Sequence, residues 1–553
     1  MKLVHVYISE YKVIKKLNVP FSGKHGCFYD DQSLILRFKK NEVNYYNGVE
    51  CSAVIGNNGV GKSTILNFLE EAYGLTDSSG IIIFYDSVLN RYHVCPINLY
   101  LNEEGIETSF KFKIEPSYKS FVSSSAIKLI KANNLTGLEE LSFVKSKAKK
   151  FVHDLSLSQY AKGSKRKVIE RTSRLLEYFS MYQNDGFERT KVTFNFKFKE
   201  SSVSYVNSLI NNKALRSSLD NEQLIAVKNV IENNHMDELS FSSPHRLCKE
   251  LLFINLLSIV RNLSSLSIIP SEKRDIFFIS FLVEFDKRGL KFELLKGLIE
   301  KVASDFIRSD ESLLEMDTLI IAKKFNEISK VFWDVGRLLD FYQEDFTVVG
   351  SNEISTSNVD LIVRLTGAIQ LLPSNISTNF IFGWHGLSTG EFARLNLFSE
   401  LFHFINSEKR NEKEKYLLVM DEVDLFQHPD WQRTFLEDLL NFIGLMFPKD
   451  RVQLILSTHS PIIVSDFLPE DIVSLKVDNE GKTVLCKAYG FGTQITDLYL
   501  HGMHLNSTFG EYSKKLLSSI LKRRDENNLT HEDRLLISRI EDISIRNMFL
   551  RKP

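Results

Sequence analysis

Short runs of apolar residues occur in two regions of the chain and are separated by a long region with a different residue pattern. Residues 1–115 carry runs such as CSAVI at 51–55, which are typical of β-strands. Similar runs return between 376 and 500, where YLLVM at 416–420 and VQLIL at 452–456 are continuously apolar. Continuous apolar runs of this length indicate strands that are buried on both faces, as in a parallel sheet covered by helices. The pattern therefore predicts an α/β fold.

The segment between these regions, roughly residues 120–375, is richer in Leu, Ser, Asn, Lys and Glu and shows helical spacing in many windows. No heptad pattern is sustained over many turns, so we predict a compact helical insertion rather than a long coiled coil. The end of the chain has a helical, charged pattern. The predicted domains are two parts of one α/β unit at 1–120 and 376–500, the mainly helical insertion at 121–375, and a helical tail at 501–553.

Length, charge, cysteines and apolar runs add four constraints. A chain of 553 residues is too long for one compact core and predicts two or three domains. Its net charge of −1 argues against constitutive coating of DNA, which needs a basic excess. The five cysteines are far apart and indicate neither a disulfide framework nor a zinc site. The first residues lack the apolar block of a signal peptide, and no apolar run reaches the ~18–20 residues of a membrane span, so we expect a cytoplasmic protein without membrane contact.

The motif GNNGVGKS at 56–63 lies between the strand-like CSAVI and the helical run TILNFLEEAY. It satisfies G-x-x-x-x-G-K-[ST], a phosphate-binding loop. Glycines let the backbone wrap phosphates, and the following helix presents free N–H groups to anionic oxygens. The lysine would reach the β- and γ-phosphates of ATP, and the serine hydroxyl would ligate Mg²⁺. The predicted phosphate-binding residues are Gly56, Asn57, Asn58, Gly59, Gly61, Lys62, Ser63 and Thr64, with Lys62 also catalytic and Ser63 also a metal ligand.

Two polar clusters follow the later apolar strands. YLLVMDEVD at 416–424 delivers carboxylates to a strand end, where α/β folds place ligands. Asp421 would hold Mg²⁺, and Glu422 would polarise the attacking water. In STHS at 457–460, His459 would donate a hydrogen bond to the γ-phosphate. Taken alone, acids after a strand are common, and a lone histidine there is usually a polar loop residue.

LSTGE at 387–391 precedes an amphipathic helix. The apolar residues of that helix recur every three or four positions, at Phe392, Leu395, Phe398, Phe402 and Ile405. Ser388 or Thr389 would cap the helix and leave an N terminus that attracts anions. By itself, this motif is no more than a capped helix.

In order and content, the four motifs resemble the head of ABC-type ATPases. GNNGVGKS is similar to the Walker A motif, YLLVMDE to Walker B and LSTGE to the signature, while Asp424 falls at the D-loop and His459 at the switch histidine. In that family, signature residues of one subunit contact the γ-phosphate held by the other. The resemblance therefore implies that Ser388, Gly390, Glu391 and Asp424 serve nucleotide sites completed in a head-to-tail homodimer or higher homo-oligomer. Glu391 stands where transporters carry glutamine, as in heads of the SMC, RecF and OLD kind.

The spacing of the motifs narrows the resemblance. From Ser63 to Ser388 is 325 residues, far more than a bare head needs. The resemblance implies an ABC-type P-loop ATPase head with a large helical insertion and a helical C-terminal tail, which excludes an ordinary transporter subunit. Gln159 is the candidate for the family's Q-loop glutamine.

The stretch YGFGTQITDLYLHGMHLNSTFGEYSKKLL at 489–517 resembles a segment that follows the switch histidine in ATPases of bacterial anti-phage systems. These include the Septu ATPases and their relatives in retron operons. The resemblance implies an ATP-hydrolysing subunit that gates a partner HNH nuclease and, in retrons, also engages a reverse transcriptase with its RNA–DNA product. The alternatives are a DNA-repair ATPase of the RecF or SMC kind that clamps DNA directly, and a scaffold that hydrolyses little ATP. The near-neutral charge disfavours the first alternative, and Glu422 disfavours the second.

Other features leave their own alternatives. His501 and His504 in HGMH invite a metal interpretation, although a polar loop is the simpler one without nearby acids or cysteines. The stretch 145–174 holds ten Lys/Arg and two acids, which fits a solvated, flexible face or a surface for nucleic acid or a partner. No Toprim acid cluster follows Ser460, and no zinc or HNH set is present at usable spacing, so the chain is not expected to be a nuclease itself.

Overall fold

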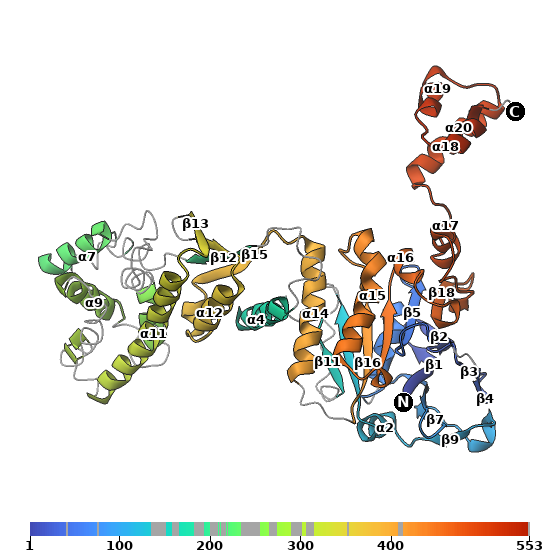
Figure 1. Ribbon diagram of the computed structural model, residues 1–553, viewed down its shortest axis with the longest axis horizontal. Helices are drawn as coiled ribbons and strands as arrows, with labels where there is room; N and C mark the ends of the chain where they lie inside the picture. The colour runs from blue at the N-terminus through green and yellow to red at the C-terminus, as the bar shows by residue number, and fades with distance from the viewer. Residues whose placement is uncertain are drawn as a thin grey trace.

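The fold is described by a computed structural model of the chain. It describes residues 1–39, 43–74, 77–133, 151–156, 165–181, 193–198, 208, 211, 217, 219–233, 255–264, 274–288, 301–302, 304–305, 315–350, 353–407 and 413–550. Figure 1 shows an elongated molecule in which the first and the later parts of the chain build one large α/β body. A second lobe lies to one side of this body, and the last helices stand apart from it.

A seven-stranded sheet forms the centre of the α/β body, with the strand order β11-β10-β16-β17-β5-β18-β19. All neighbouring strands pair in parallel except β18 and β19. Its strands are β5 (Glu50–Gly56), β10 (Ile127–Asn133), β11 (Val152–Asp154), β16 (Lys415–Asp421), β17 (Val452–Ser457), β18 (Ile472–Val477) and β19 (Thr483–Cys486). The apolar runs at 51–55, 416–420 and 452–456 are three of these strands, so the predicted parallel strands and the mixed α/β class are confirmed.

Helices cover both faces of this sheet, which explains why its strands are apolar at consecutive positions. Leu417 and Val419 of β16 face a core shared with α1, whereas Leu418 and Met420 face a core shared with α14, α15 and α16. These helices are α1 (Lys62–Glu71), α14 (Thr389–Ser407), α15 (Pro429–Met446) and α16 (Pro461–Val464). Successive side chains of β16 point to opposite faces of the sheet, so this one strand contributes to the apolar cores on both faces.

Two smaller sheets complete the body near the amino terminus. The five-stranded sheet has the order β2-β1-β6-β7-β9 and the three-stranded sheet the order β3-β4-β8. Their strands are β1 (Lys2–Tyr11), β2 (Ile14–Pro20), β3 (His25–Tyr29), β4 (Leu34–Phe38), β6 (Ser79–Asp86), β7 (Arg91–Ile97), β8 (Ile106–Thr108) and β9 (Lys111–Ile114), and α2 (Tyr118–Ser124) follows them. Residues of β1, β2 and β6 pack with α1 in one core, so these strands support the helix that begins at Lys62.

The second lobe contains a sheet that the sequence pattern did not predict. Strands β13, β14, β12 and β15 form an antiparallel sheet in that order, and its phenylalanines share one core with the surrounding helices. The elements of the lobe are β12 (Thr193–Phe198), β13 (Phe346–Gly350), β14 (Glu353–Thr356), β15 (Phe380–His385), α4 (Lys165–Met181), α7 (Asn221–Asn233), α9 (Arg274–Arg288), α11 (Glu315–Phe341), α12 (Val359–Gln370) and α13 (Ser374–Ser377). Helix α4 packs against both α12 and α14 and so joins this lobe to the α/β body.

Two details bear on the predicted domain limits. Strands β10 and β11 fall in the range predicted as the insertion, yet they lie in the seven-stranded sheet beside β16. Strand β15 falls in the range predicted as the α/β unit, yet it pairs with β12 of the second lobe. The chain therefore crosses between the two bodies later than residue 120 and again after residue 385.

The carboxyl-terminal region leaves the seven-stranded sheet after β19. It contains α17 (Ile495–Asp497), the π-helical turn η6 (Leu498–Gly502), and the helices α18 (Glu511–Asp525), α19 (His531–Ser538) and α20 (Ile543–Leu550). The last three helices share a small core of their own, centred on Ile520, Ile537 and Phe549. In the part of the chain that the structure describes, no helix is long and apolar enough to cross a membrane.

Candidate functional site

The loop between β5 and α1 has a backbone that favours glycine at three places. The angle φ is 144° at Gly56, 81° at Gly59 and 96° at Gly61, a region that side chains with a Cβ disfavour. A Cβ on Gly56 would lie 2.4 Å from the carbonyl oxygen of Leu475. Gly61 provides no side-chain cap for the first amides of α1. The loop and the helix N terminus therefore offer N–H groups to an anion, and a phosphate fits this cradle.

Lys62 begins α1 and is buried, with 6% of its surface exposed. Its Nζ donates hydrogen bonds to the carbonyl oxygens of Gly56, at 3.0 Å, and Asn57, at 3.2 Å. Burial lowers the pKa of Lys62, while the nearby carboxylates, Asp421 foremost, act in the opposite direction. The ammonium group is thus held inside the loop and faces the acids at the end of β16.

The other residues of the loop divide into exposed and partly buried ones. Asn57, Asn58 and Gly59 are exposed at its outer curve. Ser63 and Thr64 are partly buried in the first turn of α1, directly after Lys62. The predicted phosphate-binding residues therefore lie in one continuous turn, and the serine hydroxyl follows the lysine into the helix.

Residues at the end of β17 contact the acids that end and follow the neighbouring strand β16. Asp421 is 8% exposed and accepts a short hydrogen bond from the hydroxyl of Ser457. The backbone N–H of Glu422 donates to the same hydroxyl oxygen at 3.1 Å. Asp424 accepts from the Thr458 hydroxyl at 2.6 Å. Glu422 itself has φ of 52°, a conformation that is uncommon for a residue other than glycine and that is frequent at functional sites.

His459 lies at the same edge of the sheet as these acids. Its backbone N–H donates to Asp424 Oδ1 at 3.1 Å. Burial and the charge of Lys62 lower the pKa of His459, so its imidazole is neutral near pH 7. The ring lines a cavity of about 420 Å³ together with Gly56, Asn57 and Asn58. The structure thus brings Lys62, the acids of β16 and His459 to one place.

The LSTGE motif forms the start of α14. Ser388 Oγ accepts from the N–H of Glu391 at 3.2 Å, and Glu391 Oε2 accepts from the N–H of Ser388 at 2.7 Å, which makes a reciprocal capping box. A Cβ on Gly390 would lie 2.2 Å from the carbonyl oxygen of Phe426, so only glycine allows the close approach to the loop after β16. Ser388 and Thr389 are exposed. None of these residues lines the cavity beside His459 in the same chain.

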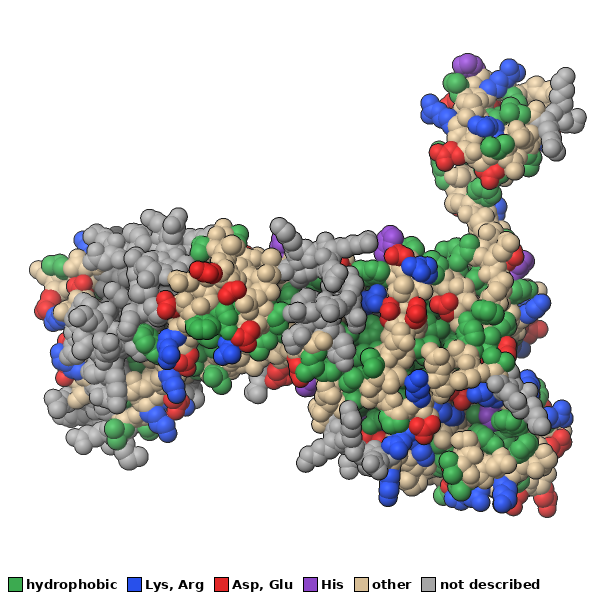
Figure 2. Space-filling model, viewed as in Figure 1, with side chains coloured by type: hydrophobic (Ala, Val, Ile, Leu, Met, Phe, Trp, Pro, Cys, Tyr) green, Lys and Arg blue, Asp and Glu red, His purple; other side chains and the backbone are tan. Residues whose placement is uncertain are grey.

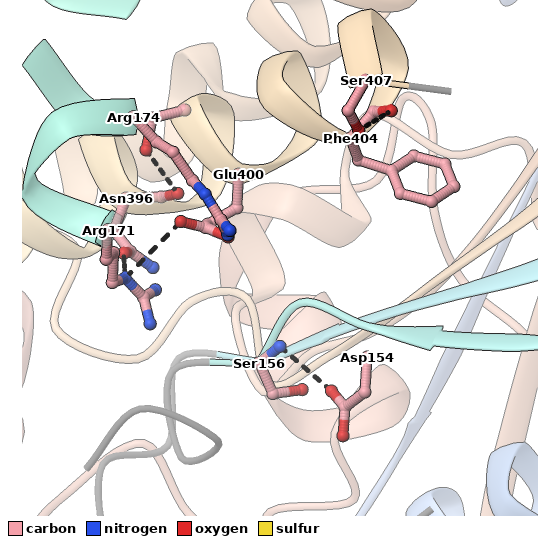
Figure 3. Close-up of polar contacts among 9 residues, drawn as sticks. Asp154, Ser156, Arg171, Arg174, Asn396, Glu400, Phe404 and Ser407 are labelled. Atoms are coloured by element: carbon pink, nitrogen blue, oxygen red, sulfur yellow. Dashed lines mark hydrogen bonds and ion pairs between the residues drawn. The ribbon is translucent and has the colours of Figure 1, made fainter. Parts of the chain in front are cut away.

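A buried ion pair ties α14 to α4 (Figure 3). Glu400 is 1% exposed, and its carboxylate accepts from Arg174 Nη1 at 3.0 Å and lies 3.9 Å from Arg171 Nε. The Nε of Arg171 also donates a short hydrogen bond to Asn396 Oδ1. Both arginines belong to α4, so this helix is fastened to the side of the helix that carries the LSTGE motif.

Sequence reasoning did not single out Asn133, which the structure places at the same sheet edge. Asn133 ends β10 and pairs with Asp421 at the end of β16. Its Oδ1 is buried, and no described group donates a hydrogen bond to it. The pattern IKLIKAN at 127–133 is a half-buried strand ending in an amide, which is the signal that could have identified it. Gln159, the Q-loop candidate, lies outside the described residues.

The basic stretch at 145–174 is only partly described. Residues 145–150 and 157–164 lie outside the described residues, as do the side chains of 165–169. Arg171 is buried in the contact with α14, and the partly exposed Arg174 pairs there with Glu400. These two arginines therefore act within the fold.

The two histidines of HGMH have different surroundings. His501 is exposed and its ring lies 5.6 Å from that of Tyr489, whereas His504 Nε2 lies 3.2 Å from the hydroxyl oxygen of Ser474. Among the described residues, no group of three or more His, Cys, Asp or Glu side chains is arranged to hold a metal ion. The metal interpretation thus finds no ligand set in this part of the chain.

Comparison with known proteins agrees with this arrangement. The family described as AAA ATPase domain matches residues 1–464, which include every motif from the glycine-rich loop to His459. The chain is also similar to the protein named Retron Vc95 probable ATPase from Vibrio cholerae serotype O1 biovar El Tor, with 30% identity over 141 residues. That match spans 25% of this chain and 26% of the relative, so the likeness covers about a quarter of either protein. Because the family match extends over most of the chain, the protein belongs to the AAA ATPase domain family.

Proposed function

We propose that this protein binds ATP with Mg²⁺ between β5 and β16, and that a second copy of the chain completes the site for hydrolysis. One observation carries the proposal. Lys62, Asp421 and His459 converge at one sheet edge, while the exposed start of α14 lies outside the cavity of its own chain. A site that lacks its signature residues in one chain can obtain them from another.

The position of each side chain in the site indicates its role in binding or hydrolysis. The loop amides and Lys62 bind the phosphates, and the buried position of Lys62 strengthens its attraction for them. Glu422 follows Asp421 and has the unusual backbone conformation that turns it away from the strand direction. We assign it to orienting and polarising the attacking water. His459, neutral by its lowered pKa, donates a hydrogen bond to the terminal phosphate.

Mg²⁺ fits the oxygen-rich side of this site. Asp421 and Ser63 supply a carboxylate and a hydroxyl, which are the ligand types that Mg²⁺ prefers. The buried Oδ1 of Asn133, which has no donor among the described residues, is adjacent to Asp421 in the sheet and adds a third oxygen. When bound, the ion would neutralise negative charge on the phosphate oxygens. We therefore propose that Asn133, at the end of β10, is the polar residue that faces the ion, in place of the sequence candidate Gln159.

The second copy would contribute Ser388 and Gly390 at the start of its α14. Ser388 caps this N terminus by accepting from the N–H of Glu391, and it is nevertheless exposed for contact with another chain. Gly390 packs on Phe426, two residues after Asp424, so the signature and the D-loop form one surface. In a two-fold arrangement, that surface on each chain meets the loop and His459 of the other.

We further propose that the ATPase acts in a bacterial anti-phage system of the Septu or retron type and gates a partner HNH nuclease. The name of the Vibrio relative links that protein to a retron. The resemblance of residues 489–517 to Septu ATPases points in the same direction. A reverse transcriptase with its RNA–DNA product would be a further partner if the system is a retron.

Direct clamping of DNA is less well supported. The net charge is −1, and Figure 2 shows acidic and basic side chains interspersed over the described surface of this face. Arg171 and Arg174, from the most basic stretch, are engaged with Glu400 inside the fold. A DNA clamp would need a basic surface supplied by other residues.

A mixing experiment tests the composite site. Lys62→Ala removes the phosphate-binding lysine, and Ser388→Arg obstructs the exposed signature surface; each variant alone should be inactive. In a 1:1 mixture, half of the dimers contain both variants, and each of these has one intact site. Activity should return to about a quarter of the wild-type value if the two sites of a two-fold dimer act independently.

The control separates folding from catalysis. Ser388→Arg removes the cap of α14, which costs about 1 kcal/mol, so the variant must be shown to bind ATP and to unfold cooperatively. Absence of recovery in a mixture whose heterodimers are verified by mass would contradict a site built from two chains. Activity of Ser388→Arg alone equal to wild type would contradict any role of the signature.

A further inference from the structure

The segment from Leu498 to Asn506 returns to the sheet edge after the chain has left β19. Leu498 and Met503 anchor it, because both are buried in the core that also holds α14, α15 and α16. Two backbone hydrogen bonds hold the segment in a turn: Met503 N–H donates to the Leu498 carbonyl oxygen at 2.8 Å, and Leu505 N–H donates to the Tyr499 carbonyl oxygen at 3.1 Å. The turn η6 packs against α16, the helix that begins two residues after His459.

This anchored segment forms the second wall of the cavity beside the phosphate-binding loop. One wall consists of residues 56–58 and His459, and the other includes Tyr499, His504 and Asn506. The volume of the cavity is about 420 Å³. Because His459 and the first residues of the phosphate-binding loop line the same cavity as this segment, a terminal phosphate held by the loop would lie next to the segment.

His504 is held in a defined orientation within this wall. Its Nε2 lies 3.2 Å from the hydroxyl oxygen of Ser474, which is 1% exposed on β18. Ser474 pairs with Ile55 on β5, one residue before the loop begins. The φ of His504 is 57°, a conformation that is costly for a residue with a Cβ. The ring is thus held against β18, the strand that pairs with the one carrying the phosphate-binding loop.

The segment also leads directly to the last helices. Four residues separate Asn506 from α18, which begins at Glu511. Helices α18–α20 have their own core and stand apart from the α/β body in Figure 1. A small displacement of the anchored segment would therefore move these helices together, as a rigid body on a short connection.

We propose that residues Tyr499–Asn506 sense the terminal phosphate of the bound nucleotide. His504 contacts the phosphate and Tyr499 packs beside it, and the position of helices α18–α20 follows whether ATP or ADP is bound. The proposal rests on ATP binding at the loop of Lys62. Of the two histidines in the HGMH motif, the proposal assigns a role to His504 and none to His501.

The experiment compares His504→Ala with His501→Ala. The second is a matched control, because His501 belongs to the same motif but is exposed and does not line the cavity. Calorimetry would measure the binding of ADP and of a non-hydrolysable ATP analogue. Hydrogen exchange of residues 498–510 would report the segment in each state. The wild type should bind both nucleotides and protect the segment more strongly with the analogue.

His504→Ala should weaken binding of the analogue about tenfold, as expected for one hydrogen bond to a charged group, while ADP binding stays within about twofold. The difference in hydrogen exchange between the two nucleotides should disappear, and His501→Ala should match the wild type. Equal loss of ADP and analogue binding, or no loss of either, would overturn the sensor. His504→Gln, which keeps a polar group, guards against a variant that fails to fold. A wild type that binds neither nucleotide would instead refute the ATP site itself.

Discussion

Neutralising Glu400 should loosen the contact between α4 and α14, the helix that begins with the proposed signature motif. The carboxylate is 1% exposed and is approached by Arg174 at 3.0 Å and Arg171 at 3.9 Å. Glu400→Gln preserves the shape of the side chain but leaves the guanidinium of Arg171, itself 5% exposed, without this carboxylate. Breaking a buried pair by removing one partner typically costs about 3–5 kcal/mol.

Hydrogen exchange measures this loss of stability locally, in α4 and α14. A loss of about 3 kcal/mol corresponds to roughly a 100-fold increase in the exchange of amides in α4 and α14 that open together. Because α14 starts at Thr389, we expect the start of the helix to become less ordered and ATP turnover to fall, while nucleotide binding at Lys62 persists. Turnover and binding are therefore measured on the same preparations.

Two controls make the result interpretable. Glu327→Gln breaks an ion pair with Lys324 whose side chains are 43% and 50% exposed, so it should cost less than about 1 kcal/mol. Replacing both Arg171 and Glu400 by apolar residues of similar volume should restore much of the stability, because no buried charge of this pair remains. If exchange in α4 and α14 rises less than about threefold in Glu400→Gln, the reasoning about this buried pair is wrong.

Two further predictions follow from the proposed site. Glu422→Gln should keep ATP affinity and slow turnover by about 100-fold or more, as measured by calorimetry and single-turnover kinetics; unchanged turnover would remove Glu422 from its role. The purified chain should hydrolyse ATP and leave DNA and RNA intact with Mg²⁺ or Mn²⁺, and adding the HNH nuclease proposed as its partner should give cleavage that depends on the nucleotide. Cleavage by this chain alone that survives Lys62→Ala would contradict the division of labour.

The sequence predicted the strands and the glycine-rich loop well because their determinants are local. A continuously apolar run such as 452–456 needs only its own residues to indicate a buried strand, and it became β17. The cap of α14 is equally local, since Ser388 and Glu391 are three positions apart. Predictions of this kind depend on spacing within a few residues.

Asn133 could not be found in this way, because its significance comes from pairing across the insertion. Strand β10 pairs with β16, and Asn133 is the partner of Asp421 in this pairing. In the sequence, the second lobe lies between these two residues. The basic stretch at 145–174 is another case in which contacts between distant elements override the local pattern. A run of lysines and arginines usually indicates a solvated face, yet Arg171 and Arg174 turn inward once α4 packs on α14.

Two non-local contacts, α4 with α14 and residues 498–506 with the cavity beside His459, bear on how a partner could control the proposed nucleotide site. Helix α4 connects the second lobe to α14, whose first residues would act on the neighbouring copy. The segment at 498–506 connects helices α18–α20 to the cavity of the same chain. A partner on the second lobe would thus change the signature delivered to another site, whereas a partner on the last helices would respond to the chain's own nucleotide. Variants of Glu400 and His504 separate these two routes, because the first should alter turnover in the partner's site and the second should alter discrimination between ATP and ADP in the same chain.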